Sequence, residues 1–130
     1  MNETQQAAAI ERIAQIAVPV KDVARATAFY RDVLGLKLWL EVSGMSFFEL
    51  GGVRIMLAKA EEGEHDHPAS IIYYQVADIH TMHAALSARD VHFEGEPHKV
   101  ADMGTYELWM AFFRDTENNT LALTSDKRKS

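Results

Sequence analysis

The sequence predicts an α+β fold in which two βαβββ modules form a curved mixed sheet shaped like a cup. A strand–cap–helix motif occurs twice, first as residues 15–23 and again as residues 71–79. Alternating apolar stretches follow each copy and predict further strands. The chain has 130 residues, and its 48% hydrophobic content suits one compact domain. One such module leaves the apolar face of its sheet open, so we expect two modules, within a chain or between chains, to cover it.

The first module follows from residue periodicity. Residues 13–20 alternate and predict a strand, and Asp22 is suited to cap the helix that follows. Apolar residues at helical spacing continue to Leu34, and Gly35 is expected to end that helix. Three strands are predicted next, at residues 38–42, 45–50 and 53–58, with turns at Ser43-Gly44 and Gly51-Gly52.

The second module repeats this order. Residues 70–76 predict a strand, and Ile79, Met82, His83 and Leu86 form one stripe of a helix. A short strand is predicted at residues 91–94, followed by a long irregular connection through Pro97 and Gly104. The last elements are strands at residues 106–114 and 120–124, joined by a turn at residues 115–119 in which asparagine tolerates a positive φ.

These elements define the expected organisation of the chain. Residues 1–10 are predicted to be an N-terminal tail and residues 11–125 a single domain. Its modules are residues 11–60 and 69–125, joined by the polar linker 61–68, and a C-terminal tail occupies residues 126–130. The basic run 127–129 is expected to be solvated.

Composition excludes several classes of function. The chain has no cysteine, which rules out disulfides and Cys-ligated zinc. Its net charge is −6 and its basic residues are scattered, so we expect no nucleic-acid partner. It contains no run of 18 apolar residues and no secretory signal pattern, so we expect no membrane partner and a cytoplasmic location.

Two motifs carry a resemblance to a known family. Residues 20–36 read V-x-D-V, then F-Y-x-x-V-L-G-L, and residues 113–119 read F-R-D-T-E-N-N. Together with the repeat, these resemble the vicinal oxygen chelate superfamily, which includes glyoxalase I, extradiol dioxygenases, fosfomycin-resistance enzymes and bleomycin-resistance proteins. Thr116 replaces the proline and Asn118 the glycine of the family's F-x-D-P-D-G-N turn. The resemblance covers about residues 11–125 and implies the cup fold.

The resemblance also implies four matched strand positions for metal ligands. In this sequence they are occupied by Gln15, Met56, Ile71 and Ala122. Only the amide of Gln15 is a possible ligand, whereas a catalytic divalent cation usually needs about three imidazole or carboxylate ligands. We therefore predict no cofactor and no metal site of the family's usual kind.

The same positions suggest a pocket for a small molecule. Gln15 is expected either to hydrogen-bond a ligand or to bond the backbone or water. Met56, Tyr73, Trp109 and Phe113 are expected to line an apolar and aromatic cup, although periodicity does not decide which face of residues 108–113 points inward. Arg54 is either a partner for an anionic ligand at the rim or a solvated edge residue.

Six histidines raise the question of another metal site. His65 and His67 fall in the polar linker, and His80 and His83 lack a well-placed third ligand. His98 follows Pro97 in the predicted irregular segment and is the candidate acid–base or ligand-contact residue, because its reference pKa is near neutrality.

We weigh three functions. The first is a metal-free small-molecule-binding protein, similar to the bleomycin-resistance branch and homodimeric. The alternative is a lyase, isomerase or dioxygenase-like enzyme, with His98 as acid–base group or with a divalent metal held by Gln15, His98 and a carboxylate such as Glu49 or Asp102. The third is an interaction domain with a filled core and no cavity.

Overall fold

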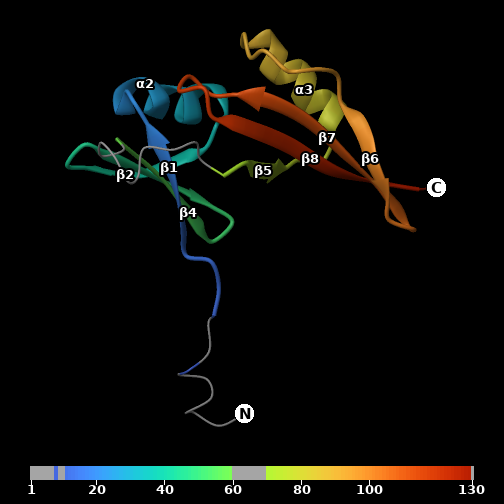
Figure 1. Ribbon diagram of the computed structural model, residues 1–130, viewed down its shortest axis with the longest axis horizontal. Coiled ribbons are helices and arrows are strands. Elements are labelled where there is room, and N and C mark those ends of the chain that lie inside the picture. The colour runs from blue at the N-terminus through green and yellow to red at the C-terminus, as the bar shows by residue number, and fades with distance from the viewer. Residues whose placement is uncertain (1–7, 9–10, 60–69, 130) are drawn as a thin grey trace.

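The computed structural model describes Ala8 and residues 11–59 and 70–129. Within them the chain forms two four-stranded mixed sheets, with strand orders β1-β4-β3-β2 and β5-β8-β7-β6 (Figure 1). The first sheet comprises β1 (Gln15–Val20), β2 (Lys37–Val42), β3 (Met45–Leu50) and β4 (Val53–Lys59). The second comprises β5 (Ile72–Gln75), β6 (His98–Asp102), β7 (Tyr106–Arg114) and β8 (Thr120–Arg128). The predicted α+β fold of two βαβββ modules is confirmed.

The helix of the first module begins and ends where its capping residues predict. Helix α2 (Val23–Ala28) starts after Asp22, whose Oδ1 accepts a hydrogen bond from the Arg25 amide at 3.0 Å. The helix continues as a π-helical turn, η1 (Phe29–Val33). The chain then turns at Gly35, whose φ of +78° is one that residues with a side chain rarely adopt.

The second module caps its helix in the same way. Helix α3 (Ile79–Ala88) follows Asp78, whose Oδ1 accepts hydrogen bonds from the amides of His80 and Thr81. Its inner face buries Ile79 and Leu86. The two modules therefore share the strand–cap–helix start that the repeated motif predicts.

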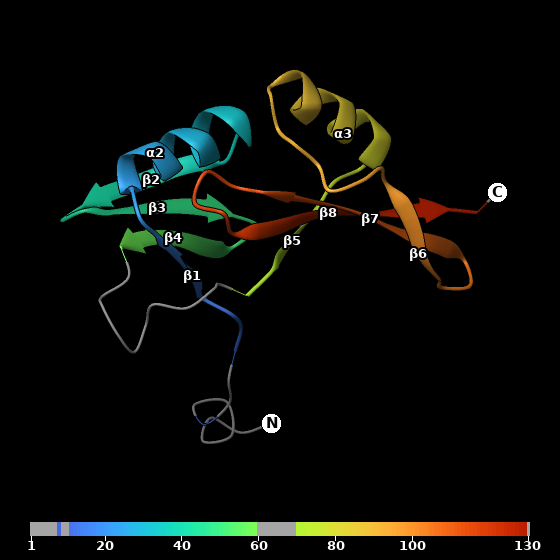
Figure 2. The same ribbon diagram turned by 45° about the horizontal axis from the view of Figure 1, so that its top comes forward.

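Both helices lie on the same side of the two sheets (Figure 2). The core lies between helices and sheets and includes Val18 and Leu57 of the first sheet and Phe113 and Leu121 of the second. Because successive residues of a strand point to opposite faces, the residues between these core positions lie on helix-free faces. We call these surfaces the open faces.

A turn of the second module holds the two modules together. The backbone of residues 115–119 reverses direction with Asn118 at a φ of +66°, as the sequence predicts. Asp115 is buried in the turn, and its Oδ2 accepts a 2.7 Å hydrogen bond from the hydroxyl of Tyr30 in the first module. Asn119 donates to the carbonyl of Pro19, which adds a second connection across the modules.

Glu117 makes the most extensive connection between the modules. Its carboxylate accepts hydrogen bonds from the amides of Lys21 and Asp22, both at 2.9 Å, and from the guanidinium of Arg25. Burial by itself would raise the pKa of Glu117, but these bonds and one from the Thr116 hydroxyl outweigh it and lower the pKa to about 2. The carboxylate therefore stays ionised and bound to the start of α2.

Three sequence predictions differ from the structure. Residues 91–94 form only an isolated bridge, between Phe93 and Phe113, rather than a strand. The connection predicted to be irregular contains β6, an edge strand interrupted by a bulge between Lys99 and Ala101. Strand β8 continues to Arg128, so most of the predicted C-terminal tail is strand, held in register with β7.

Some predictions fall where the structure is not described. The linker 61–68, with His65 and His67, lies outside the described residues, as does nearly all of the N-terminal tail. No helix within the described ranges has the length and hydrophobicity needed to span a membrane.

Candidate functional site

The open face of the first sheet carries three of the predicted site residues. Gln15 is paired with Arg54 across β1 and β4, and Met56 is paired with Ala17. These residues alternate with the core residues Ile55 and Leu57, so they lie on the face away from the helices. The predicted inward row of the first module is therefore a row on the open face.

The open face of the second sheet carries Tyr73. Tyr73, Ala122 and Phe112 form one cross-strand row over β5, β8 and β7. The rings of Tyr73 and Phe112 pack edge to face with centroids 6.1 Å apart, and Ala122 is fully buried between them. Ile71 precedes Tyr73 by two residues and is 42% exposed.

Two predicted pocket residues point to the other side of this sheet. Trp109 packs against His80 of α3, and Phe113 is fully buried in the helix-side core. Trp109 and Phe113, which were expected to line the cup beside Tyr73, therefore lie on the helix side of this sheet rather than on its open face. Met110 and Phe112 occupy the open face instead, and residue periodicity could not show this because both faces of β7 are apolar.

The open faces expose more large apolar side chains than a solvated surface usually does. Trp39 of β2 is 50% exposed, and Tyr73 is 48% exposed. Leu40, Val42 and Ile71, also on these faces, are each 40–42% exposed. Both sheets therefore present an apolar surface on the side that the helices leave uncovered.

The positively charged side chain of Arg54 lies within this apolar surface. The guanidinium carbon of Arg54 is 4.5 Å from the ring centroid of Trp39, which packs edge to face against Phe47. Arg54 forms no ion pair with the carboxylates of the described ranges, although Glu49 is its cross-strand neighbour. Beside it, the Gln15 amide has one weak contact, 3.6 Å from the Met56 sulfur.

The four positions that correspond to the family's metal ligands do not suit a metal ion. Gln15 and Met56 belong to the first sheet, while Ala122 belongs to the second and Ile71 directly precedes its strand β5. Ile71 and Ala122 have no donor atom, and a thioether is a poor ligand for Mg²⁺, Zn²⁺ or Fe²⁺. Throughout the described ranges, no group of three or more His, Asp or Glu side chains is arranged to hold a metal.

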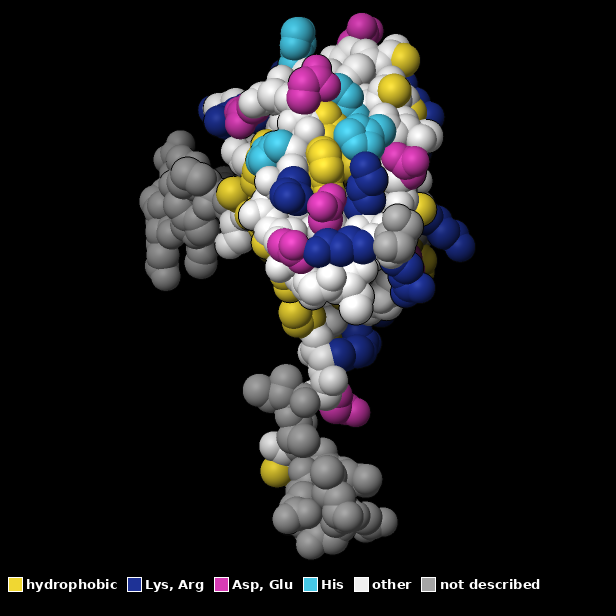
Figure 3. Space-filling view, turned by 90° about the vertical axis from the view of Figure 1, so that its right-hand side faces the viewer, with side chains coloured by type: hydrophobic (Ala, Val, Ile, Leu, Met, Phe, Trp, Pro, Cys, Tyr) yellow, Lys and Arg dark blue, Asp and Glu magenta, His cyan; other side chains and the backbone are white. Residues whose placement is uncertain are grey.

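The described histidines gather at the α3–β6 end of the molecule. Figure 3 shows histidine side chains on this face, interspersed with acidic, basic and hydrophobic ones. His83 packs on Phe93 with ring centroids 4.3 Å apart, and its Nε2 is 3.9 Å from Glu96. His98, in β6, is exposed, and its Nδ1 lies 3.2 Å from the Glu96 carbonyl oxygen. Its ring centroid is 6.4 Å from that of Phe112, so it borders the open face.

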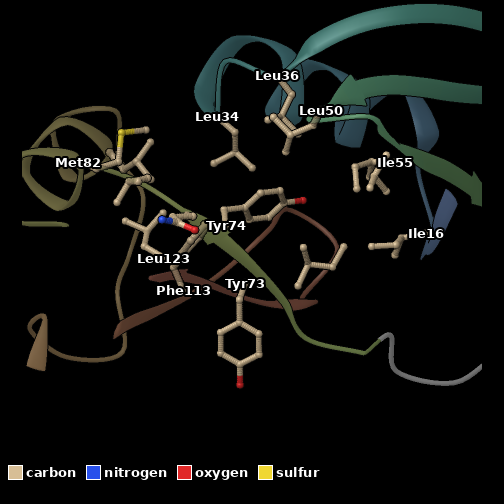
Figure 4. A pocket seen from close by; sticks show the side chains of 15 residues that line it. Ile16, Leu34, Leu36, Leu50, Ile55, Tyr73, Tyr74, Met82, Phe113 and Leu123 are labelled. Atoms are coloured by element: carbon tan, nitrogen blue, oxygen red, sulfur yellow. The ribbon is translucent and has the colours of Figure 1, made fainter. Parts of the chain in front are cut away.

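A cavity lies between the two modules, and we call it the seam cavity. Its volume is about 430 Å³, and none of the 15 residues that line it is charged (Figure 4). One wall comes from the first module, with Leu34, Leu36 and Ile55, and the other from β5, α3 and the core of the second. Tyr73 and Phe113 both border it, but its other lining residues were not predicted to bind a ligand.

Comparison with known proteins agrees with this architecture. Residues 12–123 match the model of the family described as the glyoxalase/bleomycin resistance protein/dioxygenase superfamily. A search of curated proteins finds no match to the sequence.

Solved structures with the same fold are distant in sequence. A lactoylglutathione lyase from Agrobacterium tumefaciens has a TM-score of 0.72 at 20% identity, covering 89% of this chain and 94% of that one. An integron cassette protein from V. cholerae has a TM-score of 0.73 at 18% identity, with 90% and 96% covered. A glyoxalase/bleomycin resistance protein/dioxygenase from Nocardioides has a TM-score of 0.70 at 19% identity, with 98% and 92% covered.

At these identities the neighbours show the fold alone, and the family match supplies the assignment. The chain belongs to the glyoxalase/bleomycin resistance protein/dioxygenase superfamily.

Proposed function

We propose that this protein is a metal-free small-molecule-binding member of the superfamily, which acts as a homodimer and holds an apolar or aromatic ligand against its open faces. The observation that carries the proposal is the exposure of Trp39, Leu40, Ile71 and Tyr73 on the helix-free side of the sheets. Apolar surface of this extent is favoured at interfaces and ligand sites.

A second copy of the chain is the partner that suits these faces. The two modules share one topology, so a twofold rotation brings the open face of each module over that of the partner's other module. Such an isologous pairing turns two open sheets into two equivalent cups. Each cup would contain residues from both chains.

Three side chains are proposed to fix the orientation of the ligand. Arg54, stacked on Trp39, supplies a cation with no ion-pair partner in the described part of the chain, and it would attract an anionic group on the ligand. The Gln15 amide, beside Arg54, can hydrogen-bond the same group. His98 borders the open face of the second sheet and is a further contact.

The enzyme alternative has less support from the geometry. Its metal-dependent form requires Gln15 and His98 to meet a carboxylate such as Glu49 or Asp102, whereas its other form uses His98 as the acid–base group. Within one chain, Gln15 and Glu49 are on the first sheet, whereas His98 and Asp102 are on β6, the far edge of the second, so the metal-dependent form would need a second chain to bring them together. Asp102 is also engaged by the Lys129 ammonium at 2.7 Å. The lyase activity named for the Agrobacterium neighbour would need a different ligand set.

Elemental analysis tests the metal-free proposal directly. The purified protein would be dialysed against trace Zn²⁺, Mn²⁺, Fe²⁺ and Ni²⁺ and then measured by mass spectrometry. We expect less than about a tenth of an equivalent of any metal, because the matched positions offer only one amide and one thioether. Near one equivalent, lost in Gln15→Ala or His98→Ala, would favour the enzyme instead.

A further inference from the structure

The seam cavity lies mostly apart from the open faces, although Tyr73 borders both. It lies between the modules and includes residues of α3 and of the turn after η1, on the side where the helices lie (Figures 2 and 4). Its volume of about 430 Å³ falls within the range of small-molecule sites. Any ligand here would not need a second chain to complete its site.

The lining determines the charge of a suitable ligand. Its residues are aliphatic or aromatic apart from Gln75, with no Lys, Arg, His, Asp or Glu among them. Burying a charged group against such a surface is strongly unfavourable, whereas burying hydrocarbon is favourable. The cavity therefore favours a neutral and mostly apolar molecule.

One buried donor marks where a polar atom of the ligand would bind. Tyr74 points from β5 into the space between the two walls, while Tyr73 points away from it (Figure 4). The Tyr74 hydroxyl is buried and has no hydrogen-bond partner in the described part of the chain. Burial, with a smaller effect from the nearby Asp115 carboxylate, raises the pKa of Tyr74, so the hydroxyl remains a neutral donor.

The nearby Asp115 carboxylate is already saturated. Its Oδ1 accepts hydrogen bonds from the amides of Glu117 and Asn119, and its Oδ2 accepts from Tyr30 and the Asn119 side chain. Four donors occupy the four acceptor positions of a carboxylate. The Tyr74 hydroxyl is thus left as an uncommitted donor, which is unfavourable unless an acceptor is supplied. Its oxygen is closed off from the cavity as well as from solvent, so an acceptor in the cavity reaches it only after a small shift of the Tyr74 side chain.

We propose that the seam cavity binds a neutral, mostly hydrocarbon molecule with a single hydrogen-bond acceptor, such as a ketone, that accepts from the Tyr74 hydroxyl. This site does not depend on the ligand proposed for the open faces or on a dimer.

Two neutral fluorescent naphthalenes test the proposal on the full chain. 6-Propionyl-2-(dimethylamino)naphthalene carries a ketone, whereas N-phenyl-1-naphthylamine has no carbonyl acceptor. We expect both to bind saturably. Tyr74→Phe should weaken binding of the ketone probe by about two- to tenfold, the range for loss of one hydrogen bond. The affinity for N-phenyl-1-naphthylamine should not change.

Matched substitutions locate the binding. Met82→Trp fills the cavity from α3 and should weaken both probes by about tenfold or more. Met103→Trp, in the exposed β6–β7 turn, lies outside the lining and should leave affinity unchanged. If Met82→Trp does not fold, Leu36→Trp fills the cavity from the opposite wall, with Met103→Trp again as the control.

Several results would overturn the proposal. Binding that survives both Met82→Trp and Leu36→Trp, or that is lost only in Met56→Trp on the open face, would place the probes on the open faces. Failure of either probe to saturate would exclude the cavity as a site. The anionic analogue 8-anilino-1-naphthalenesulfonate tests the preference for neutral ligands. If it binds as tightly as the two neutral probes and loses that binding in Met82→Trp, the preference is refuted.

Discussion

Glu117 carries, in one side chain, much of the connection between the two modules. A buried carboxylate is strongly unfavourable unless charged or polar donors surround it. Here two backbone amides, the Arg25 guanidinium and a hydroxyl donate to it. Because Lys21 and Asp22 supply those amides, the same carboxylate also satisfies donors at the start of α2.

Glu117→Gln should destabilise the fold in a pH-dependent way. The pKa of Glu117 falls from an ordinary 4.5 to about 2 in the folded protein, so its ionised form stabilises the fold fully above about pH 5. That stabilisation is lost as the pH falls through 4.5 toward 2. At neutral pH we expect the variant to lose about 3 kcal/mol in the free energy of unfolding, measured with urea.

The pH dependence provides the control for this measurement. The difference between the wild type and Glu117→Gln should shrink steadily at about pH 4 and then pH 3. Glu94→Gln removes a carboxylate from an exposed pair with Arg114 and should change stability by under about 1 kcal/mol. An equal loss for Glu117→Gln at neutral and acidic pH would contradict the assigned pKa.

The turn between β7 and β8 is the element in which backbone conformation matters most. Asn118 adopts a φ of +66°, where a β-carbon is unfavourable and asparagine is better tolerated than most residues. Asn118→Ala and Asn118→Gly both remove the amide that lies 3.4 Å from Arg114. Only the alanine variant keeps the unfavourable β-carbon. We therefore expect its free energy of unfolding in urea to be about 1 kcal/mol lower than that of the glycine variant. Equal stabilities would show that the turn relaxes.

Strand β7 shows where periodicity stops being informative. Residues 108–113 are all apolar, so a period of two cannot separate their faces. Packing of Trp109 against α3 and of Phe113 in the core decides the orientation, and these contacts come from distant parts of the chain. In contrast, the alternation and capping aspartates of β1 and α2 are local, and there the prediction and the structure agree.

Strand β6 was missed for a related reason. The segment 98–102 has a polar or basic residue at three of its positions and follows a proline. Its register shifts at a bulge between Lys99 and Ala101, which breaks any alternation. Pairing with β7, rather than intrinsic preference, makes it a strand.

At the scale of the whole molecule, the open faces lie on the side that the helices leave uncovered, where we propose that a second copy binds. Tyr73→Glu places a charge on the proposed interface and should shift the protein from dimer to monomer in sedimentation velocity, because a buried unpaired charge is unfavourable. Ala88→Glu, on the exposed side of α3, should remain dimeric. A wild-type protein that is monomeric at all concentrations would contradict the proposed assembly.

The seam cavity could not be predicted from the sequence because its walls are separated along the chain. Leu36 follows the π-helical turn, Tyr74 belongs to β5, and Leu86 belongs to α3. Each residue suits an ordinary core position by local pattern. Only the relative placement of the two modules leaves space between them.

The turn that joins the modules also has a consequence for synthesis on the ribosome. The hydrogen bond from the Lys21 amide to Glu117 spans 96 residues, and that from Tyr30 to Asp115 spans 85. The chain emerges N-terminus first, so the first βαβββ unit is complete well before its partners at residues 115–119 appear. During that interval, Tyr30 and the start of α2 lack the groups that satisfy them. The nascent first module should therefore stay loosely packed and open to chaperones until the last hairpin leaves the exit tunnel.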